Sequence, residues 1–233
     1  MALLRKTDET VDTFLNGKLR IIQSRQGYRF SIDALLLAEF VLIKDEDFVI
    51  DLGAGSGIIS LFLAVKKKVG FIVGIELQKE LASQAQRNLA LNELERKIAI
   101  IQGDLRHLPL TRGLADVIVC NPPYRQQRSG RINPDETKAI ARHEIAASLD
   151  AILAAAKALL KRGGRLTMIY PANRLTEVFT KMRTEGLEPK RLQIIFPDSA
   201  SYAKLALIEG RLQGRSGLKI LPPIFGQGRY SVL

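Results

Sequence analysis

Residues 51–57, DLGAGSG, are the part of the sequence that best indicates the fold. They follow an apolar segment, DFVIDLG (47–53), and precede a second one, GIISLFLAVKKK (57–68). This pattern predicts a buried strand, a turn and a helix. Glycine adopts positive φ angles at no steric cost, so three glycines favour a sharp turn that a ligand can approach closely. The N-terminus of the expected helix adds free N–H groups and a positive dipole end.

The alternation of strand and helix continues along most of the chain. Two segments near the C-terminus, 191–197 and 203–212, predict an antiparallel pair of strands. A Gly163-Gly164 pair is expected to end a helix at 146–160. Alternating units with unbroken apolar strands indicate an α/β fold, in which a mostly parallel sheet carries helices on both faces. The remaining expected strands are 70–76, 97–104, 115–120 and 165–170, and the remaining expected helices are 78–92 and 173–185.

An extension precedes this core. Residues 18–30, KLRIIQSRQGYRF, alternate in polarity around a Gln-Gly turn and predict a β-hairpin. The next segment, SIDALLLAEFVLI (31–43), predicts a helix with Ser31 as its N-cap. The chain of 233 residues is expected to form a single domain, in which residues 1–43 are the hairpin and helix extension of a core at 44–233.

The composition limits the environment and the partners of the protein. Lysine and arginine number 35 against 24 aspartates and glutamates, and the net charge of +11 makes nucleic acid the first candidate partner. A basic protein without a polyanionic partner is the alternative. A single cysteine excludes an intramolecular disulfide. The N-terminus has no uninterrupted apolar signal segment, and the longest apolar run, 34–43, is too short to span a bilayer. We therefore expect a soluble cytoplasmic protein.

Acidic residues end the second and third expected strands of the core. Parallel strands present their carboxyl ends at one edge of the sheet, where ligands bind. Glu76 is placed there to accept hydrogen bonds from a ribose diol, and Asp104 could hydrogen-bond the edge of an adenine. The pattern predicts a nucleotide-like cofactor, and a glycine-rich turn with only a structural role is the alternative. The expected cofactor-binding residues at this edge are Gly53, Gly55, Gly57, Glu76 and Asp104.

The glycine spacing distinguishes between two cofactors. A dinucleotide fold requires G-x-G-x-x-G, but here the third glycine comes one residue early and Ile58 occupies the expected position. Asp51, directly before the turn, would repel a pyrophosphate and attract an aminoalkyl or sulfonium cation. S-adenosylmethionine is therefore favoured over NAD. Ser31 and Asp33 precede the first core strand and could contact the methionine end of this cofactor, although helix capping is an equal alternative for Ser31.

The fourth core strand ends in NPPY (121–124). An exocyclic amine of a base is a poor nucleophile, and acceptors on both of its N–H bonds would free its lone pair. The Asn121 side chain and the Pro122 backbone carbonyl can supply these acceptors, and the prolines restrict their motion. Tyr124 can stack on a flipped base. The alternative is an Asn-Pro turn with a surface tyrosine.

The segment RQQRSGRINPDETKAIARH (125–143) follows this motif and is basic. We expect it to be a loop that covers the substrate, with Arg125, Arg128 and Arg131 on RNA phosphates. A solvated surface loop is the alternative. No His or Cys cluster in the sequence has the spacing of metal ligands, so no metal is expected.

Taken in order, DLGAGSG, Glu76, Asp104 and NPPY resemble the class I S-adenosylmethionine-dependent methyltransferases that modify amino groups. Within that class the chain resembles the bacterial family that methylates N6 of an adenine beside the anticodon of valine tRNA. The motifs that carry this closer resemblance are GYRFSIDALLLAEF (27–40), ARHE (141–144), YPANRL (170–175) and LPPI (221–224).

The resemblance implies a Rossmann-like fold with a seven-stranded sheet, and a cofactor that lies along Gly53 and Gly55 with Glu76 on its ribose and Asp104 at its adenine. It also implies RNA, and most closely tRNA, as the substrate. Other amino acceptors remain open: guanine N2 of rRNA, adenine in DNA, or a release-factor glutamine. A non-catalytic RNA-binding protein with this fold is the alternative from another functional class.

Overall fold

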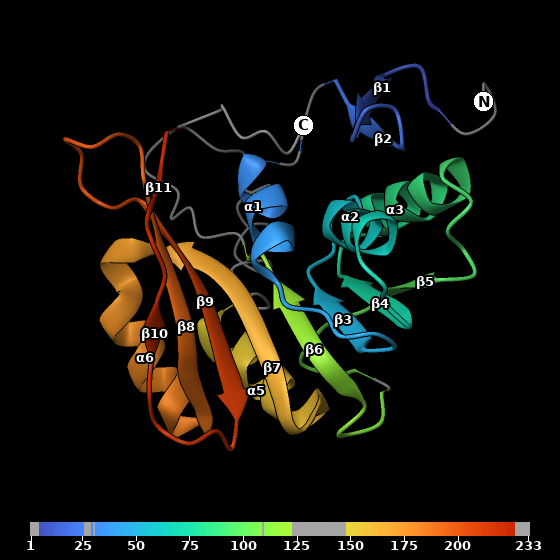
Figure 1. Ribbon diagram of the computed structural model, residues 1–233. Helices are drawn as coiled ribbons and strands as arrows, with labels where there is room; N and C mark the ends of the chain where they lie inside the picture. The colour runs from blue at the N-terminus through green and yellow to red at the C-terminus, as the bar shows by residue number, and fades with distance from the viewer. Residues whose placement is uncertain (1–4, 26–28, 30, 109, 123–147, 227–233) are drawn as a thin grey trace, which may run out of the picture.

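The computed structural model of the chain describes residues 5–25, 29, 31–108, 110–122 and 148–226 (Figure 1). Strands and helices alternate from β3 to β5 and again from β6 to β8, as expected from the apolar segments. The elements are β1 (Glu9–Phe14), β2 (Leu19–Ser24), α1 (Ile32–Phe40), β3 (Phe48–Leu52), α2 (Ile58–Lys66), β4 (Phe71–Glu76), α3 (Lys79–Leu91), β5 (Ile98–Gln102), β6 (Ala115–Cys120), α5 (Leu149–Leu159), β7 (Leu160–Pro171), α6 (Leu175–Thr184), β8 (Leu187–Phe196), β9 (Leu205–Leu212), β10 (Lys219–Ile220) and β11 (Ile224–Phe225), with a 3-10 turn at Ala172–Arg174.

A single large sheet organises the core. Its strand order is β10-β8-β9-β7-β6-β3-β4-β5, and β11 also pairs with β8. Strands β3 to β7 are parallel to their neighbours among themselves, whereas β9 is antiparallel to both β7 and β8. The chain runs outward from β3 through β4 to β5 and then returns to β6 on the other side of β3. This reversal between β3 and β6 creates the point at which open α/β sheets bind ligands. The predicted α/β fold is confirmed.

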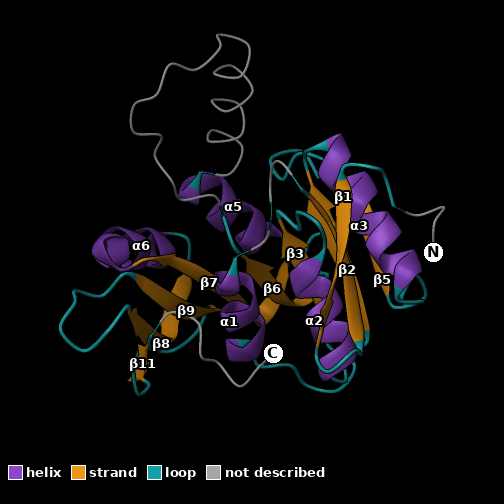
Figure 2. Ribbon diagram, turned by 90° about the horizontal axis from the view of Figure 1, so that it is seen from above, coloured by secondary structure: helices purple, strands orange, loops and turns teal. Residues whose placement is uncertain are grey.

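Helices cover both faces of the sheet (Figure 2). One apolar cluster packs α1, α2, α3 and the β1–β2 hairpin against one face. A second cluster packs α5 and α6 against the other face. Strands β3 and β6 contribute side chains to both clusters, which explains why their sequences are mostly apolar.

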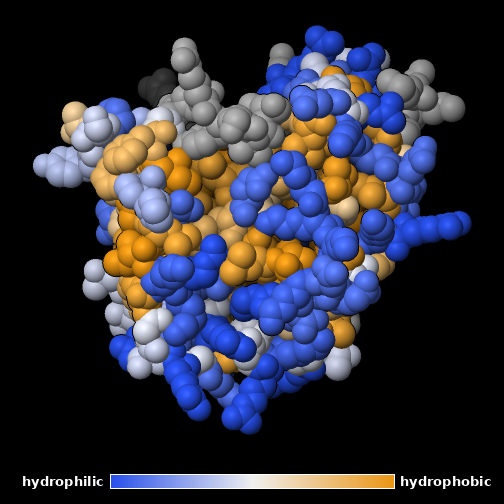
Figure 3. All heavy atoms as spheres, viewed as in Figure 1, coloured by the Kyte–Doolittle hydropathy of each residue, from blue (hydrophilic) through white to orange (hydrophobic). Residues whose placement is uncertain are grey.

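The seven expected strands are all present. In the described residues the two-residue strands β10 and β11 add to the edge at β8, which gives a sheet of nine strands. Figure 3 shows hydrophobic surface over this region, and exposed apolar side chains there include Ile220 and Phe225. Gly163 and Gly164 do not end a helix but lie inside β7, which begins at Leu160. Their backbone, with φ +76° at Gly163, forms a bulge that shifts the register between β6 and β7.

The predicted hairpin was also placed incorrectly. Residues 19–24 pair with the preceding segment 9–14, and the turn is at 15–18. Asn16 and Gly17 both have positive φ there, which is the conformation that Asn-Gly turns adopt. The proposed Gln26-Gly27 turn lies outside the described residues.

Three cationic side chains bind the carbonyl groups at the end of α1. Lys67 donates to the carbonyls of residues 39 and 41, Arg191 to that of residue 40, and Arg165 to that of residue 42. Helix ends leave such carbonyls unpaired and carry a partial negative charge, so cations stabilise them. Burial lowers the pKa of Lys67. These contacts fix α1, which follows the hairpin, to β7, β8 and the end of α2.

Replacing Arg191 with Met should destabilise the fold by about 3 kcal/mol. Arg191 Nη1 lies 2.7 Å from Glu209 Oε2, both side chains are largely buried, and the substitution leaves Glu209 without its ionic partner. Urea unfolding measures the change. Lys157→Met is the control, since it breaks the exposed pair with Glu185 and should cost under about 1 kcal/mol. Equal losses of unfolding free energy in the two variants would contradict a stabilising role for the buried Arg191–Glu209 pair.

Candidate active site

The carboxyl ends of three neighbouring strands lie at one level. Leu52 of β3 is opposite Ile75 of β4 and Cys120 of β6. The residue that follows each of these three positions therefore continues the same row, at the point where the strand order reverses. These residues are Gly53, Glu76 and Asn121.

The turn after β3 has the conformation that its glycines allow. Gly53, Gly55 and Gly57 have φ angles of 74°, 57° and 85°, which side chains with a Cβ rarely adopt. A Cβ on Gly53 would have no described atom within 4 Å, so the backbone is open to a ligand at this position. A Cβ on Gly57 would lie 3.3 Å from Ala85 Cβ, so this glycine lets α2 pack against α3. The turn therefore has an open part and a packed part.

Glu76 holds the turn in place. Its buried carboxylate accepts hydrogen bonds from the N–H groups of Gly55 and Gln78, both at 2.8 Å. A carboxylate has about four acceptor positions, so it can still accept from a ribose diol.

Asp51 is fully buried beneath the turn. Its Oδ2 accepts a 2.7 Å hydrogen bond from the Ser60 hydroxyl, whereas Oδ1 has no hydrogen-bond partner among the described residues. Burial, with a smaller effect of the Glu76 charge, raises the pKa of Asp51 to about 6. The same burial and the Asp51 charge raise the pKa of the Cys120 thiol, which favours a neutral packing role for it. An unpaired buried carboxylate oxygen is a natural partner for a cation.

The other expected cofactor residues lie after β5 and at the start of α1. Asp104 follows β5, but its carboxylate accepts hydrogen bonds from the Arg106 backbone and guanidinium, which lower its pKa. Any contact with an adenine must therefore compete with Arg106. Ser31 is at the N-cap position of α1, yet its side chain makes no capping bond within the described part of the chain. Asp33 lies in the first turn of the same helix.

Only the start of NPPY lies in the described structure. Asn121 is partly exposed directly after β6, and Pro122 is buried. Tyr124 and the three arginines expected on RNA phosphates, Arg125, Arg128 and Arg131, lie outside the described residues.

Sequence reasoning missed two polar residues around the turn. Ser60 lies on α2 and bonds Asp51, and Asn88 lies on α3 and bonds the Ser56 carbonyl. Both occupy buried positions of their helices, and a polar residue on the buried face of a helix was the available signal. In the described residues no three His, Cys, Asp or Glu side chains form a metal-binding group, and no helix is long and apolar enough to cross a membrane.

Comparison with known proteins identifies the family of the chain. A family model described as methyltransferase small domain matches residues 28–185. The chain belongs to this methyltransferase family. A protein of Shewanella putrefaciens named tRNA1(Val) (adenine(37)-N6)-methyltransferase is 30% identical over 168 residues, which cover 70% of this chain and 69% of that protein.

Solved structures of methyltransferases share the fold. A predicted O-methyltransferase from Agrobacterium tumefaciens has a TM-score of 0.67 at 20% identity, with 83% of this chain and 86% of that chain covered. The P. horikoshii TYW2 structure, a complex with MeSAdo, has a TM-score of 0.62 at 18% identity, with 90% and 73% covered. These similarities confirm the expected class I methyltransferase fold.

The protein is thus a methyltransferase enzyme with S-adenosylmethionine as its cofactor, as the sequence predicted. The geometry of the site fits this cofactor on three counts. The backbone at Gly53 is open, Glu76 has free acceptor positions, and Asp51 Oδ1 is unpaired among the described residues.

Asp51→Asn should change how stability depends on pH. The pKa of Asp51 rises from 3.8 to about 6 on folding. Between about pH 4 and pH 6 the folded, cofactor-free wild type therefore binds more protons than the unfolded chain, and its stability falls as the pH rises. Asp51→Asn has no carboxyl group to titrate here, so it lacks this loss. The unfolding free energy of the variant minus that of the wild type should therefore rise by up to about 3 kcal/mol as the pH goes from about 4 to 6. Urea unfolding from pH 4 to pH 7 measures the difference, and a value that stays constant with pH would contradict the assignment.

Proposed function

We propose that this enzyme methylates the exocyclic N6 amine of an adenine in RNA, in a tRNA next to the anticodon. The observation that carries the proposal is the position of Asn121, which lies in one row with Gly53 and Glu76 at the reversal of strand order. Asn121 follows β6, which pairs with β3, so an amine held by Asn121 lies next to the cofactor turn. The name of the Shewanella putrefaciens relative supports adenine N6 and tRNA as the target.

In this proposal the protein positions and activates the amine. S-adenosylmethionine supplies a methyl group that its sulfonium has already activated. The Asn121 side-chain oxygen and the Pro122 backbone carbonyl accept hydrogen bonds from the two amine N–H groups, which frees the nitrogen lone pair. Tyr124 stacks on the flipped adenine, and the amine proton leaves to solvent after transfer.

The cofactor contacts follow from the same geometry. Glu76 accepts hydrogen bonds from the ribose hydroxyls while its carboxylate remains held by Gly55 and Gln78. Asp51 faces the cationic end of the cofactor with its unpaired oxygen. Asp104 contacts the adenine once Arg106 is displaced, and Ser31 and Asp33 lie toward the methionine end.

The RNA contacts are expected on the same edge of the sheet. Arg125, Arg128 and Arg131 bind phosphates in this proposal, in keeping with the net charge of +11. The loop 197–204 joins β8 to β9 at the carboxyl end of β7, because Pro171 pairs with Leu205. That loop therefore lies on the rim that holds Asn121.

Loop 197–204 presents an aromatic ring to solvent. Tyr202 is 96% exposed, more than any other large hydrophobic side chain in the described residues. The loop is nevertheless ordered: Asp198 accepts from the Ala200 N–H and the Ser201 hydroxyl, and the Lys204 N–H donates to the Ile195 carbonyl. A tyrosine that buries almost nothing adds little to stability, but it can stack on an RNA base.

Methyl transfer should be specific for adenine N6 in tRNA and should depend on Asn121. Wild type and Asn121→Ala are incubated with labelled S-adenosylmethionine and unmethylated tRNA, rRNA, DNA or protein, followed by nucleoside analysis. The wild type should form N6-methyladenosine in tRNA, and the variant should lose at least about a hundredfold in rate while it binds cofactor normally. Label in rRNA, DNA or protein would overturn the tRNA target and retain the chemistry. An equally active variant would overturn the role of Asn121.

Tyr202→Ala should raise the KM for the RNA by about tenfold and leave the KM for S-adenosylmethionine unchanged, since base stacking is lost and the cofactor turn is not touched. Steady-state kinetics at varied RNA concentration measures both constants. Tyr202→Phe is the matched control, because it keeps the ring and should behave as wild type. An unchanged KM for RNA in Tyr202→Ala would remove this residue from the RNA surface.

A further inference from the structure

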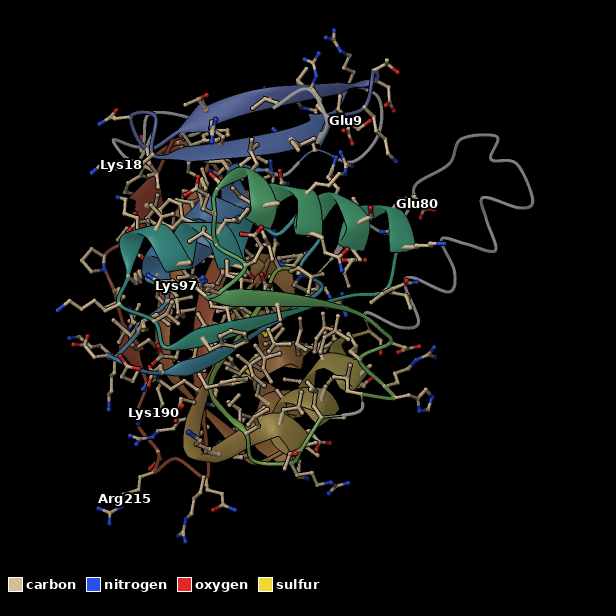
Figure 4. All side chains as sticks on the ribbon, turned by 90° about the vertical axis from the view of Figure 1, so that its right-hand side faces the viewer. Glu9, Lys18, Glu80, Lys97, Lys190 and Arg215 are labelled. Carbon is tan, nitrogen blue, oxygen red and sulfur yellow. The ribbon has the colours of Figure 1, made fainter. Side chains whose placement is uncertain are left out.

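Two asparagines on α3 pair with the backbone of β2. The Ile22 N–H donates to Asn88 Oδ1 at 2.6 Å, and Asn88 Nδ2 donates back to the Ile22 carbonyl at 3.2 Å. Asn92 makes the same pair of bonds with Arg20, at 2.9 and 2.7 Å. The spacings match, since four helical residues rise about 6 Å and two strand residues about 6.6 Å. Figure 4 shows the hairpin lying along α3, with Glu9 and Glu80 toward one end and Lys18 toward the other.

The remaining donor of each carboxamide distinguishes the two asparagines. Asn88 Nδ2 also donates to the Ser56 carbonyl at 2.9 Å, whereas Asn92 Nδ2 donates to the Asn88 carbonyl within the same helix. Ser56 lies between Gly55, which donates to Glu76, and Gly57, which is the N-cap of α2. Asn88 is fully buried, and its hydrogen bonds with Ile22 and Ser56 link the hairpin directly to the cofactor turn.

The hairpin has a further anchor that does not involve the turn. Glu9 of β1 accepts hydrogen bonds from Arg87 and Gln84 of α3. Contact with Arg87 lowers the pKa of Glu9 to about 2. The hairpin thus remains attached to α3 when a single asparagine is changed, and the effect on the cofactor turn can be measured separately.

We propose that Asn88 is a positioning residue for the cofactor turn and couples hairpin docking to cofactor binding. Its amide fixes the orientation of the peptide between Ser56 and Gly57, and this peptide must turn at positive φ. When the hairpin leaves, Asn88 loses both bonds to Ile22 and no longer holds the Ser56 carbonyl in place. Coupling of this kind is reciprocal, so a bound cofactor in turn holds the hairpin against α3.

The matched variants Asn88→Ala and Asn92→Ala test the proposal. Each removes two bonds to β2, so both should lower the melting temperature, but only the first removes the bond to the turn. By calorimetry, the Kd for S-adenosylhomocysteine should rise about tenfold in Asn88→Ala and less than twofold in Asn92→Ala. Equal Kd values in the two variants would show that Asn88 only holds the hairpin and would overturn the proposal.

Hydrogen exchange of the wild type provides a test that requires no variant. Saturating S-adenosylhomocysteine should slow the exchange of the Ile22 amide at least fivefold. The Leu221 amide, which bonds the Leu192 carbonyl at the far edge of the sheet, is the control and should keep its local exchange rate. An unchanged exchange rate of the Ile22 amide on ligand binding would overturn the proposal. Because this test uses the wild type, it holds even if Asn88→Ala fails to fold. Both measurements omit RNA, so their outcome is independent of the proposed tRNA substrate.

Discussion

The hydrogen bond from the Gly55 N–H to the Glu76 carboxylate joins the turn after β3 to the end of β4, and the site depends on it. The bond requires the turn to fold back over β4, which in turn requires positive φ at its glycines. It also requires Gly74 on β4, because a Cβ there would lie 2.7 Å from Ile100 Cδ1 and 3.0 Å from Ala54 Cβ. Asp51, directly before the turn, is fully buried, whereas the backbone of Gly53 within the turn is open.

The sequence predicted those parts of the fold that local pattern determines. Predominantly apolar segments indicate the parallel strands, since both faces of such strands are buried. The first strand of the hairpin buries Glu9, a residue type that a local pattern assigns to the surface. Arg87 and Gln84 on α3 make this burial favourable. No local pattern shows a partner that lies 78 residues away. The Asn16-Gly17 pair is a stronger local turn signal than the Gln-Gly pair, and it marks the turn that the structure shows.

The site was predictable to a similar depth. The turn glycines, Asp51 and Glu76 stand at strand ends, and the order of strands alone brings them together. Ser60 and Asn88 could not be assigned a role from the sequence, because their partners are set by how α2 and α3 pack. Asp104 follows β5, and its engagement by Arg106 depends on a side-chain conformation and not on a motif.

Fold similarity and acceptor choice are separate matters in this protein. The Agrobacterium tumefaciens structure shares the fold at 20% identity and is described as a predicted O-methyltransferase, so the architecture alone does not select an amine. Methylation of a hydroxyl needs a base that removes its proton, whereas an amine can lose its proton after transfer. The carboxylate in the row of strand ends is Glu76, which already accepts two N–H bonds. In the proposed function the residue on the substrate side is Asn121, whose amide is not a base. The chemistry of this row therefore favours an amino acceptor.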